Sequence, residues 1–285
     1  MDEIALRGGG CALNTASALA KLGLQAAVVG KVGDDALGDF LLGLLRERRL
    51  DARGVLRDPG EPTSGTVVMV DARGERTFLH LPGANAALRA DELDAELLFG
   101  GRALHVAGSL VMPALDGEPT ARILREARER GLLTSLDTVF DATGRWERVK
   151  PALPLLDLFT PGIQEARALT GEHEPPRIAA RLRELGVREL ALTMGADGSY
   201  AAGEGFEGFI APLPVQAVDG TGSGDAFAAG LLYGKLAGWP FERAARFANA
   251  AGALATTAVG ATEGVRGVEE TLALAGLDSD LRSAV

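Results

Sequence analysis

Apolar residues along the chain alternate between strand-like and helical spacing, and this alternation covers most of the 285 residues. Strands are predicted where short apolar runs are rich in branched side chains, at 26–30, 103–108, 132–137, 155–160 and 188–193. Helices are predicted where apolar residues recur every three or four positions, at 11–22, 91–98, 118–130, 164–170, 176–185, 226–236 and 240–257, with one more ending at Arg49. A β ribbon is predicted at 198–211. The pattern indicates an α/β fold whose mostly parallel central sheet carries helices on both faces.

One segment interrupts this alternation. Residues 65–70 and 76–81 are β-branched or apolar runs, and Asp71 and Gly74 stand at the first and fourth positions of the turn between them. This predicts a hairpin inserted among the α/β units. A lone hairpin is too small to be stable in water, so we expect its faces to be covered by a substrate or by a neighbouring subunit.

Several polar or glycine residues lie just past the apolar runs of the predicted strands. They are Asp137, Gly162, Glu165, Thr193 and Gly195. In open α/β sheets, binding sites gather beyond the carboxyl ends of the strands. The sequence therefore predicts a site at this edge of the sheet.

The stretch from Asp219 to Asp225 combines three glycines within five residues with an acid at each end, and an apolar helix follows it. Glycines allow a sharp turn and a close approach of the backbone, and the free N–H groups of the first helical turn favour an anion such as phosphate. An ordinary acidic helix start would look similar. A carboxylate at Asp225 can take the proton of a hydroxyl that attacks a γ-phosphate, while the loop amides hold the developing charge. The chain has no G-x-x-x-x-G-K-[ST] loop, so this would be kinase chemistry of another kind.

Composition, charge and cysteine content narrow the class of protein. The chain is 47% hydrophobic and 24% charged with a net charge of −10, which argues against binding to nucleic acids or anionic membranes. Cys11 is the single cysteine, read as a small buried residue that suits a reducing compartment, and no signal peptide or membrane-length apolar run is evident. We therefore expect a cytoplasmic protein. His80, His105 and His173 share no metal-ligand spacing and are interpreted as structural or exposed.

The segment Asp219-Gly-Thr-Gly-Ser-Gly-Asp225-Ala-Phe resembles the C-terminal signature of the ribokinase-like (PfkB) carbohydrate kinases, D-T-x-G-A-G-D-x-F, with Gly220 in place of threonine. The likeness covers nearly the whole chain. It implies one three-layer α/β kinase domain over 1–285, with residues 63–84 as a small β-lid. It also implies ATP-dependent phosphorylation of a sugar hydroxyl with Mg²⁺, in which Asp225 is the base and Gly222, Ser223 and Gly224 form the anion hole.

Further segments resemble motifs of the same family. Gly9, Gly10 and Asn14 match its G-G-x-x-x-N, which implies sugar binding, and Asn85 stands in a G-A-N at the return of the lid. Asp137 joins them as an expected substrate-binding residue. On the nucleotide side, the resemblance implies roles for Thr193, Gly195 and Gly198 of a T-x-G-x-x-G, for Thr221, and for Asn249 in the adenine pocket. Glu165 and Asp219 are expected near the metal ion, a monovalent cation such as K⁺ near Gly260, and a homodimer formed through the lids.

Two departures leave alternatives open. Gly162 replaces the asparagine of the family's P-N-x-x-E, and the family's first strand, with its sugar-binding aspartate, has no counterpart before the glycines at 8–10. We expect either that upstream residues supply this strand or that another segment fills its place. The alternatives are a catalytically silent relative that binds sugar or nucleotide, a nucleoside kinase of the same fold, and a Rossmann oxidoreductase. The last is disfavoured because the glycine loop lies near residue 220 and not after the first strand.

Overall fold

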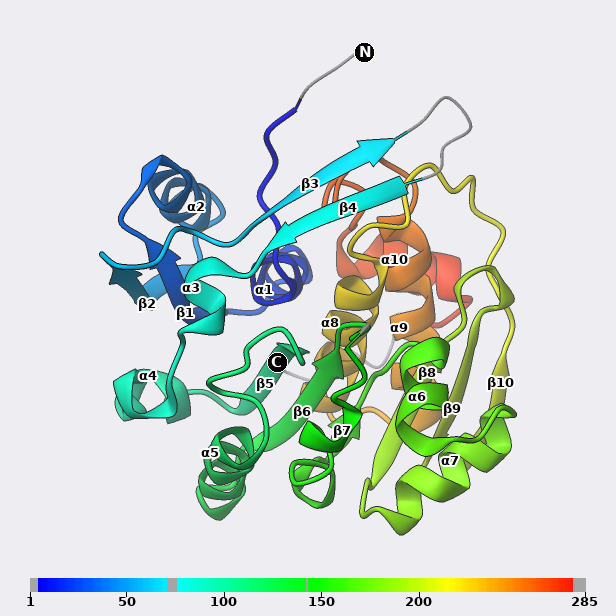
Figure 1. The fold of residues 1–285 in the computed structure, drawn as a ribbon. Helices are drawn as coiled ribbons and strands as arrows, with labels where there is room; N and C mark the ends of the chain where they lie inside the picture. Colours follow the sequence, from blue (N-terminus) through cyan, green and yellow to red (C-terminus); the bar gives the residue numbers. More distant parts are fainter. Residues whose placement is uncertain (1–4, 71–75, 142, 279–285) are drawn as a thin grey trace.

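A computed structural model describes residues 5–70, 76–141 and 143–278 of the chain. Its main element is a six-stranded sheet in the order β10-β9-β8-β7-β6-β5 (Figure 1). The strands are β5 (Ala103–Ser109), β6 (Leu133–Thr138), β7 (Leu158–Phe159), β8 (Glu189–Thr193), β9 (Ser199–Gly203) and β10 (Phe206–Ile210). Strands β5 to β8 are parallel, and β9 and β10 form an antiparallel ribbon at one edge. The mostly parallel sheet and the ribbon predicted at 198–211 are both confirmed.

Alternate residues of the strands serve two different cores. In β8, Leu190 and Leu192 point into the core that includes Ile178 and Leu182, whereas Ala191 points to the opposite face. The helices of the first face are α5 (Glu118–Glu129), α6 (Ile163–Thr170) and α7 (Pro175–Glu184), and those of the second face are α8 (Ser223–Leu236) and α9 (Phe241–Ala255) (Figure 1). Because both faces are covered, the apolar residues of the central strands serve a core on either side, as expected for parallel strands buried on both faces.

Helices α8 and α9 pack closely because α8 carries glycines where it meets α9. A Cβ atom at Gly230 would lie 2.8 Å from Ala248 Cα, and one at Gly234 would lie 2.6 Å from Ala244 Cβ. On the other side of α8, Ala226 and Ala229 share a core with Ala18 of α1 (Cys11–Lys21), and α10 (Val268–Ala275) packs beside α9 through Leu272 and Phe247. These small residues fix the position of α8 and therefore of the glycine loop before it.

We expect Gly230→Ala to lower the free energy of unfolding by about 1–3 kcal/mol, because the added methyl group has no space against Ala248. Gly43→Ala is the matched control, since Gly43 lies in α2 (Ala36–Glu47) with nothing within 4 Å of its Cβ position. There, alanine should raise stability by up to about 1 kcal/mol through its better helix propensity. Urea titrations of the three proteins test this, and a Gly230→Ala variant as stable as the wild type would contradict the packing argument.

Two strands stand apart from the main sheet. β1 (Ala27–Gly33) and β2 (Asp51–Asp58) pair in parallel and are connected by α2. Among the described residues, no strand joins this pair to β5 through hydrogen bonds. The sequence did not predict β2, whose four charged residues hide its pattern. The expectation that an upstream strand or another segment completes this part of the sheet stays a prediction.

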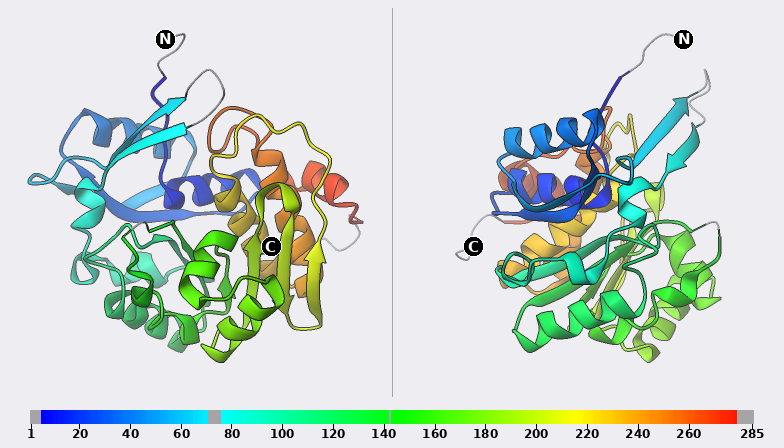
Figure 2. Two further views of the ribbon diagram at one scale, coloured as in Figure 1. Left: turned by 45° about the vertical axis from the view of Figure 1, so that its right-hand side comes forward. Right: turned by 60° about the vertical axis from the view of Figure 1, so that its left-hand side comes forward.

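The predicted hairpin is present as β3 (Gly65–Val70) and β4 (Arg76–Leu81), while its turn at 71–75 lies outside the described residues. Figure 2 shows this lid projecting from the body of the molecule. Gly65 pairs with Leu81, Val67 with Leu79 and Met69 with Thr77, so these six residues share one face. Val67, Met69, Leu79 and Leu81 on that face are all about half exposed or more.

Some predicted elements differ from the observed ones. The helix expected at 91–98 is a 3₁₀ turn, η1 (Ala90–Glu92), followed by α4 (Ala95–Phe99), because the carboxylate of Asp94 accepts hydrogen bonds from Glu96 N and Leu97 N and starts a new helix. The strand expected at 155–160 is reduced to β7, since Pro154 lies in a 3₁₀ turn just before it. No helix in the described ranges is long and apolar enough to cross a membrane.

Candidate active site

The site is built where the starts of two helices meet the ends of two strands. Asn14, in the first turn of α1, donates a 2.8 Å hydrogen bond from Nδ2 to Oδ2 of Asp225 in the first turn of α8. Asp137, near the end of β6, accepts a hydrogen bond from Gly108 N near the end of β5. Asp225, Asn14 and Asp137 are each less than one-tenth exposed. The structure therefore brings together three of the predicted site residues.

The glycine loop presents open backbone at the start of α8. Gly222 takes a positive φ of 74° as the N-cap residue, and a Cβ there would lie 2.2 Å from Ala261 O, so only glycine fits. Gly220 and Gly224, by contrast, have nothing within 4 Å of their Cβ positions and are exposed. Ser223 is held by a 2.9 Å bond from its Oγ to Gly220 O. This arrangement leaves room for an anion at the helix start.

The protonation of Asp225 is set by its surroundings. Burial raises its pKa from 3.8 to about 7, and the negative charge of Asp137 acts in the same direction. Hydrogen bonds from Asn14 and from the thiol of Cys11 act the other way, because they stabilise the ionised carboxylate. The pKa of Cys11 is raised, first by burial and then by the two aspartates. Cys11 is therefore a neighbour of the site and not only a small residue of the core.

Asp219 organises the other end of the loop. Its Oδ1 accepts hydrogen bonds from Thr221 N (2.9 Å) and Thr221 Oγ1 (2.7 Å), and its Oδ2 accepts one from Gly260 N (2.9 Å). The backbone N–H groups of Val218 and Asp219 both donate to Thr256 O. The predicted residues Asp219 and Thr221 thus join the loop to the segment after α9.

Glu165 lies in the first turn of α6, near the carboxyl end of β6. Its Oε2 accepts bonds of 2.7 Å from Gly162 N and from Thr138 Oγ1, and burial raises its pKa. Glu165 therefore acts as an acid at the helix start, and both of these hydrogen bonds use Oε2 and not Oε1. Among the described residues no cluster of three or more His, Cys, Asp or Glu is arranged to hold a metal ion, and the roles of Glu165 and Asp219 near a metal ion stay a prediction.

The residues predicted for the nucleotide lie around β8 and β9. Gly195 and Gly198 both have positive φ, and a Cβ at Gly198 would lie 2.3 Å from Ile210 O, which explains the glycine. Thr193 ends β8 and bridges to Gly162. Asn249 of α9 is 7% exposed and uses both ends of its amide, accepting from Ser199 Oγ (3.1 Å) and donating to Ala211 O (3.0 Å).

The remaining sugar-site predictions are more dispersed. Gly10 is the N-cap of α1 with a φ of 97°, and Gly9 precedes it in the open. Asn85 lies on α3 (Gly83–Ala86), at the return of the lid and against β1, not in the cluster around Asp225. Whether these residues contact a sugar stays a prediction.

His105 is a site neighbour that the sequence reasoning missed. Its Nδ1 is 3.0 Å from Ser135 Oγ, and its buried Nε2 lies 3.7 Å from Asp137 Oδ2 without a hydrogen-bond partner in the described part of the chain. The two-residue periodicity of strands could have indicated this contact. His105 pairs with Ser135, and Asp137 follows Ser135 two residues later on the same face. The contact could not be predicted from the sequence, because the register of β5 on β6 was unknown.

Comparison with known proteins identifies the class. Residues 1–266 match the family model of the pfkB family carbohydrate kinases. The chain is 30% identical over 269 residues to the 2-dehydro-3-deoxygluconokinase of Bacillus subtilis, covering 90% of this chain and 82% of that protein. It is 33% identical over 287 residues to fructokinase-1 of Zea mays, covering 93% and 87%. The chain belongs to the PfkB family of carbohydrate kinases.

Solved structures support the same assignment. The ribokinase of Thermotoga maritima superposes with a TM-score of 0.83 at 25% identity, covering 96% of this chain and 89% of that one. A fructokinase of Vibrio cholerae, solved with fructose, ADP and calcium, superposes with a TM-score of 0.78 at 26% identity, covering 93% and 90%. The chain is a sugar kinase with the ribokinase-like α/β fold. The prediction of ATP-dependent sugar phosphorylation is confirmed as its class of reaction, and the oxidoreductase alternative is wrong.

The raised pKa of Asp225 predicts a pH effect on stability. Between about pH 4 and pH 7 the folded carboxyl holds a proton that the unfolded chain has already released, so the free energy of unfolding falls as pH rises through this range. Asp225→Asn should remove part of this fall. Urea titrations at both pH values test it, with Glu204→Gln, which alters an exposed carboxyl, as the control. Equal pH slopes in the wild type and Asp225→Asn would contradict the assignment.

Proposed function

We propose that Asp225 is the general base that removes the proton of the sugar hydroxyl as it attacks the γ-phosphate of ATP. The carrying observation is the carboxylate of Asp225, buried at the start of α8 with a pKa of about 7. A base works best when its pKa lies near the operating pH. Asn14 holds the carboxylate in place through its hydrogen bond to Oδ2.

In this proposal the transferred phosphoryl group lies against the loop before α8. The first-turn amides of Gly222, Ser223 and Gly224 would hold the charge that develops on it, because they are fixed in place before the reaction. The residues that we propose to bind the nucleotide are Thr193, Gly195, Gly198, Thr221 and Asn249. The acid of Asp225 is suited to the hydroxyl and not to the phosphate, since two negative groups repel each other.

Mg²⁺ fits the residues present on one side of the site. This ion takes oxygen ligands and is usually held by one or two carboxylates together with substrate phosphates. Glu165 can offer Oε1, whereas both oxygens of Asp219 already accept hydrogen bonds from the loop. When bound, Mg²⁺ would neutralise phosphate charge. A monovalent cation beside Gly260 stays a prediction, although a variant of the Vibrio cholerae fructokinase was solved with potassium.

The acceptor that we propose is a neutral sugar. The acceptor end of the site holds two buried carboxylates, Asp137 and Asp225, and a carboxylate on the substrate would be repelled by both. Unpartnered buried groups there, Asn14 Oδ1 and His105 Nε2, suit sugar hydroxyls. Relatives of this chain include both fructokinases and a 2-dehydro-3-deoxygluconokinase, so the choice is open to experiment.

A coupled ADP-release assay over fructose, ribose, a nucleoside and 2-keto-3-deoxygluconate tests the proposal. We expect turnover with a neutral sugar, and a loss of kcat by about 10²–10⁴-fold in Asp225→Asn, because an amide cannot accept the proton. Calorimetry should show that the variant still binds ATP. Turnover of the sugar acid alone would overturn the neutral-sugar assignment, and near-normal kcat in Asp225→Asn would overturn the role of Asp225. ATP binding without any turnover would favour the catalytically silent alternative.

We also propose that the protein forms a homodimer through the lid and acts in the cytoplasm. Val67, Met69, Leu79 and Leu81 form one apolar lid face, and such a face is costly to leave in water. A second copy of the same face would cover it.

Light scattering at micromolar concentration should therefore give the mass of a dimer, and Val67→Asp with Leu79→Lys should give a monomer. The control is Phe209→Ser, which removes an equally exposed apolar side chain from β10, away from the lid. A monomeric wild type would refute the proposal.

A further inference from the structure

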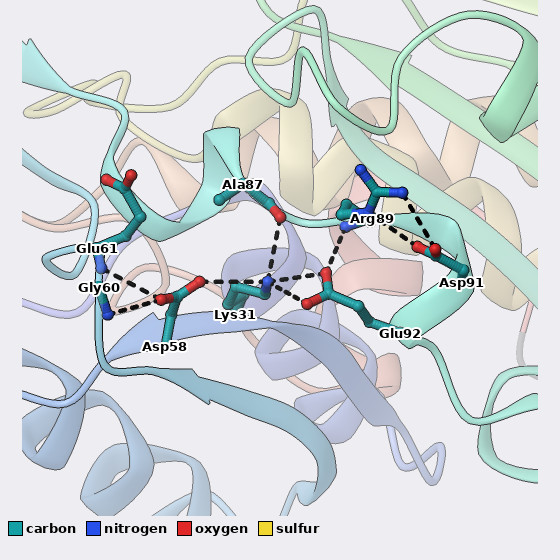
Figure 3. Close-up of polar contacts among 8 residues, drawn as sticks. All are labelled: Lys31, Asp58, Gly60, Glu61, Ala87, Arg89, Asp91 and Glu92. Atoms are coloured by element: carbon teal, nitrogen blue, oxygen red, sulfur yellow. Dashed lines mark hydrogen bonds and ion pairs between the residues drawn. The ribbon is translucent and has the colours of Figure 1, made fainter.

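Lys31 of β1 forms a polar cluster at the base of the lid. Its Nζ lies 2.6 and 2.8 Å from the two carboxylate oxygens of Glu92, 3.3 Å from Asp58 Oδ2 and 3.1 Å from Ala87 O (Figure 3). The residue is only 6% exposed, whereas its partners Asp58 and Glu92 are reached by solvent. A lysine is seldom buried to this degree unless it is paired.

The partners of Lys31 come from both sides of the lid. Asp58 ends β2, before the chain enters the lid, and its Oδ1 accepts from Gly60 N (2.9 Å) and Glu61 N (3.2 Å). Ala87 and Glu92 follow the lid, and Glu92 Oε2 also accepts from Arg89 N at 2.8 Å. The single ammonium group therefore connects the outgoing chain, the returning chain and strand β1.

A second set of bonds ties the lid to the end of the same strand. Thr63 donates from N (2.7 Å) and Oγ1 (2.6 Å) to the carboxylate of Asp35, and Gly33 N donates to Thr63 Oγ1 at 2.9 Å. The two arms of the lid are joined directly by Ala84 N, which donates to Pro62 O at 2.8 Å. Gly83 between them has a φ of 49°, and a Cβ there would lie 2.3 Å from Pro62 O.

We propose that Lys31 is a positioning residue that fixes the base of the lid, and with it α3, against β1. Asn85 of α3 stands two residues before Ala87, whose carbonyl accepts from Lys31. The orientation of Asn85 toward the sugar then depends on the ammonium group. This part of the inference rests on the proposed function, in which Asn85 binds the acceptor.

Stability alone does not explain this cluster. A buried ion pair contributes little over a well-packed apolar substitute, and its better-supported use is to hold one arrangement among several. The lid itself cannot supply that arrangement, because Val67, Val68 and Leu79 are half exposed and give it little packing. Orientation must therefore be set at its base.

The test compares Lys31→Met, Lys31→Arg and the matched control Arg53→Met. Arg53 of β2 forms an ion pair with Asp51, but it is exposed and its side chain hydrogen-bonds to Asp51 and not to the lid. The first readout is hydrogen exchange of segments 59–66 and 80–92. We expect faster exchange there in Lys31→Met, recovery in Lys31→Arg, and no change in Arg53→Met or in α8 and α9.

The second readout separates positioning from general damage. In Lys31→Met the KM for the sugar should rise about tenfold or more, since a small misplacement of a binding group is costly, while the KM for ATP stays the same. Lys31→Arg should restore most of the sugar affinity. If Lys31→Met does not fold, Glu92→Gln, which weakens the cluster and keeps the ammonium group, is measured in its place.

Each outcome decides the matter. Unchanged exchange at 59–66 and 80–92 overturns the proposal outright. Faster exchange with an unchanged sugar KM, or an equal rise of both KM values, overturns the link to the acceptor. If no sugar is phosphorylated by the wild type, the proposed function fails, and hydrogen exchange still decides whether Lys31 fixes the base of the lid.

Discussion

The hydrogen bond between Asn14 and Asp225 joins residues 211 positions apart in the sequence, and the site depends on it. It holds the start of α1 against the start of α8, so the glycine loop and the segment after Gly8 face each other. Because Asp225 is buried, its negative charge needs this donor, and the donor needs the small-residue packing of Ala18 against Ala226 and Ala229. The glycine loop, the packing of α1 against α8 and the chemistry of the Asp225 carboxylate therefore depend on one another.

The main sheet supplies the rigid part of this arrangement. Leu190 and Leu192 are buried on one face and Ala191 on the other, so the strands beneath the site are held from both sides. Polar groups then collect where the strands end: Asp137 near the end of β6, Thr193 at the end of β8, and Glu165 in the helix after β7. Rigid strands position the charged groups, and a helix start faces them, which is the general design of sites in open α/β sheets.

Much of the fold and of the site could be predicted from the sequence, because the sequence patterns that indicate them are local. The glycine loop, the alternation of strands and helices, and the lid hairpin each lie within a short window of residues. The remaining features depend on contacts between distant segments. β2 was missed because its charges mask its alternation, His105 because the register of β5 on β6 was unknown, and the break at Asp94 because a cap looks like any other acid in a helix. The Lys31 cluster draws on four separate elements, and no local pattern contains it.

The hydrogen bond from Ala84 N to Pro62 O has a consequence for how this fold can change over time. It closes the lid into a loop whose two ends meet at one point of the kinase body. Residues added to or removed from the hairpin beyond that point alter only the entropy of closing the loop, which grows slowly with length. The lid can therefore be lengthened, shortened or exchanged in evolution without disturbing the sheet, so that a new acceptor or a new subunit contact is acquired while the phosphoryl-transfer machinery is inherited intact.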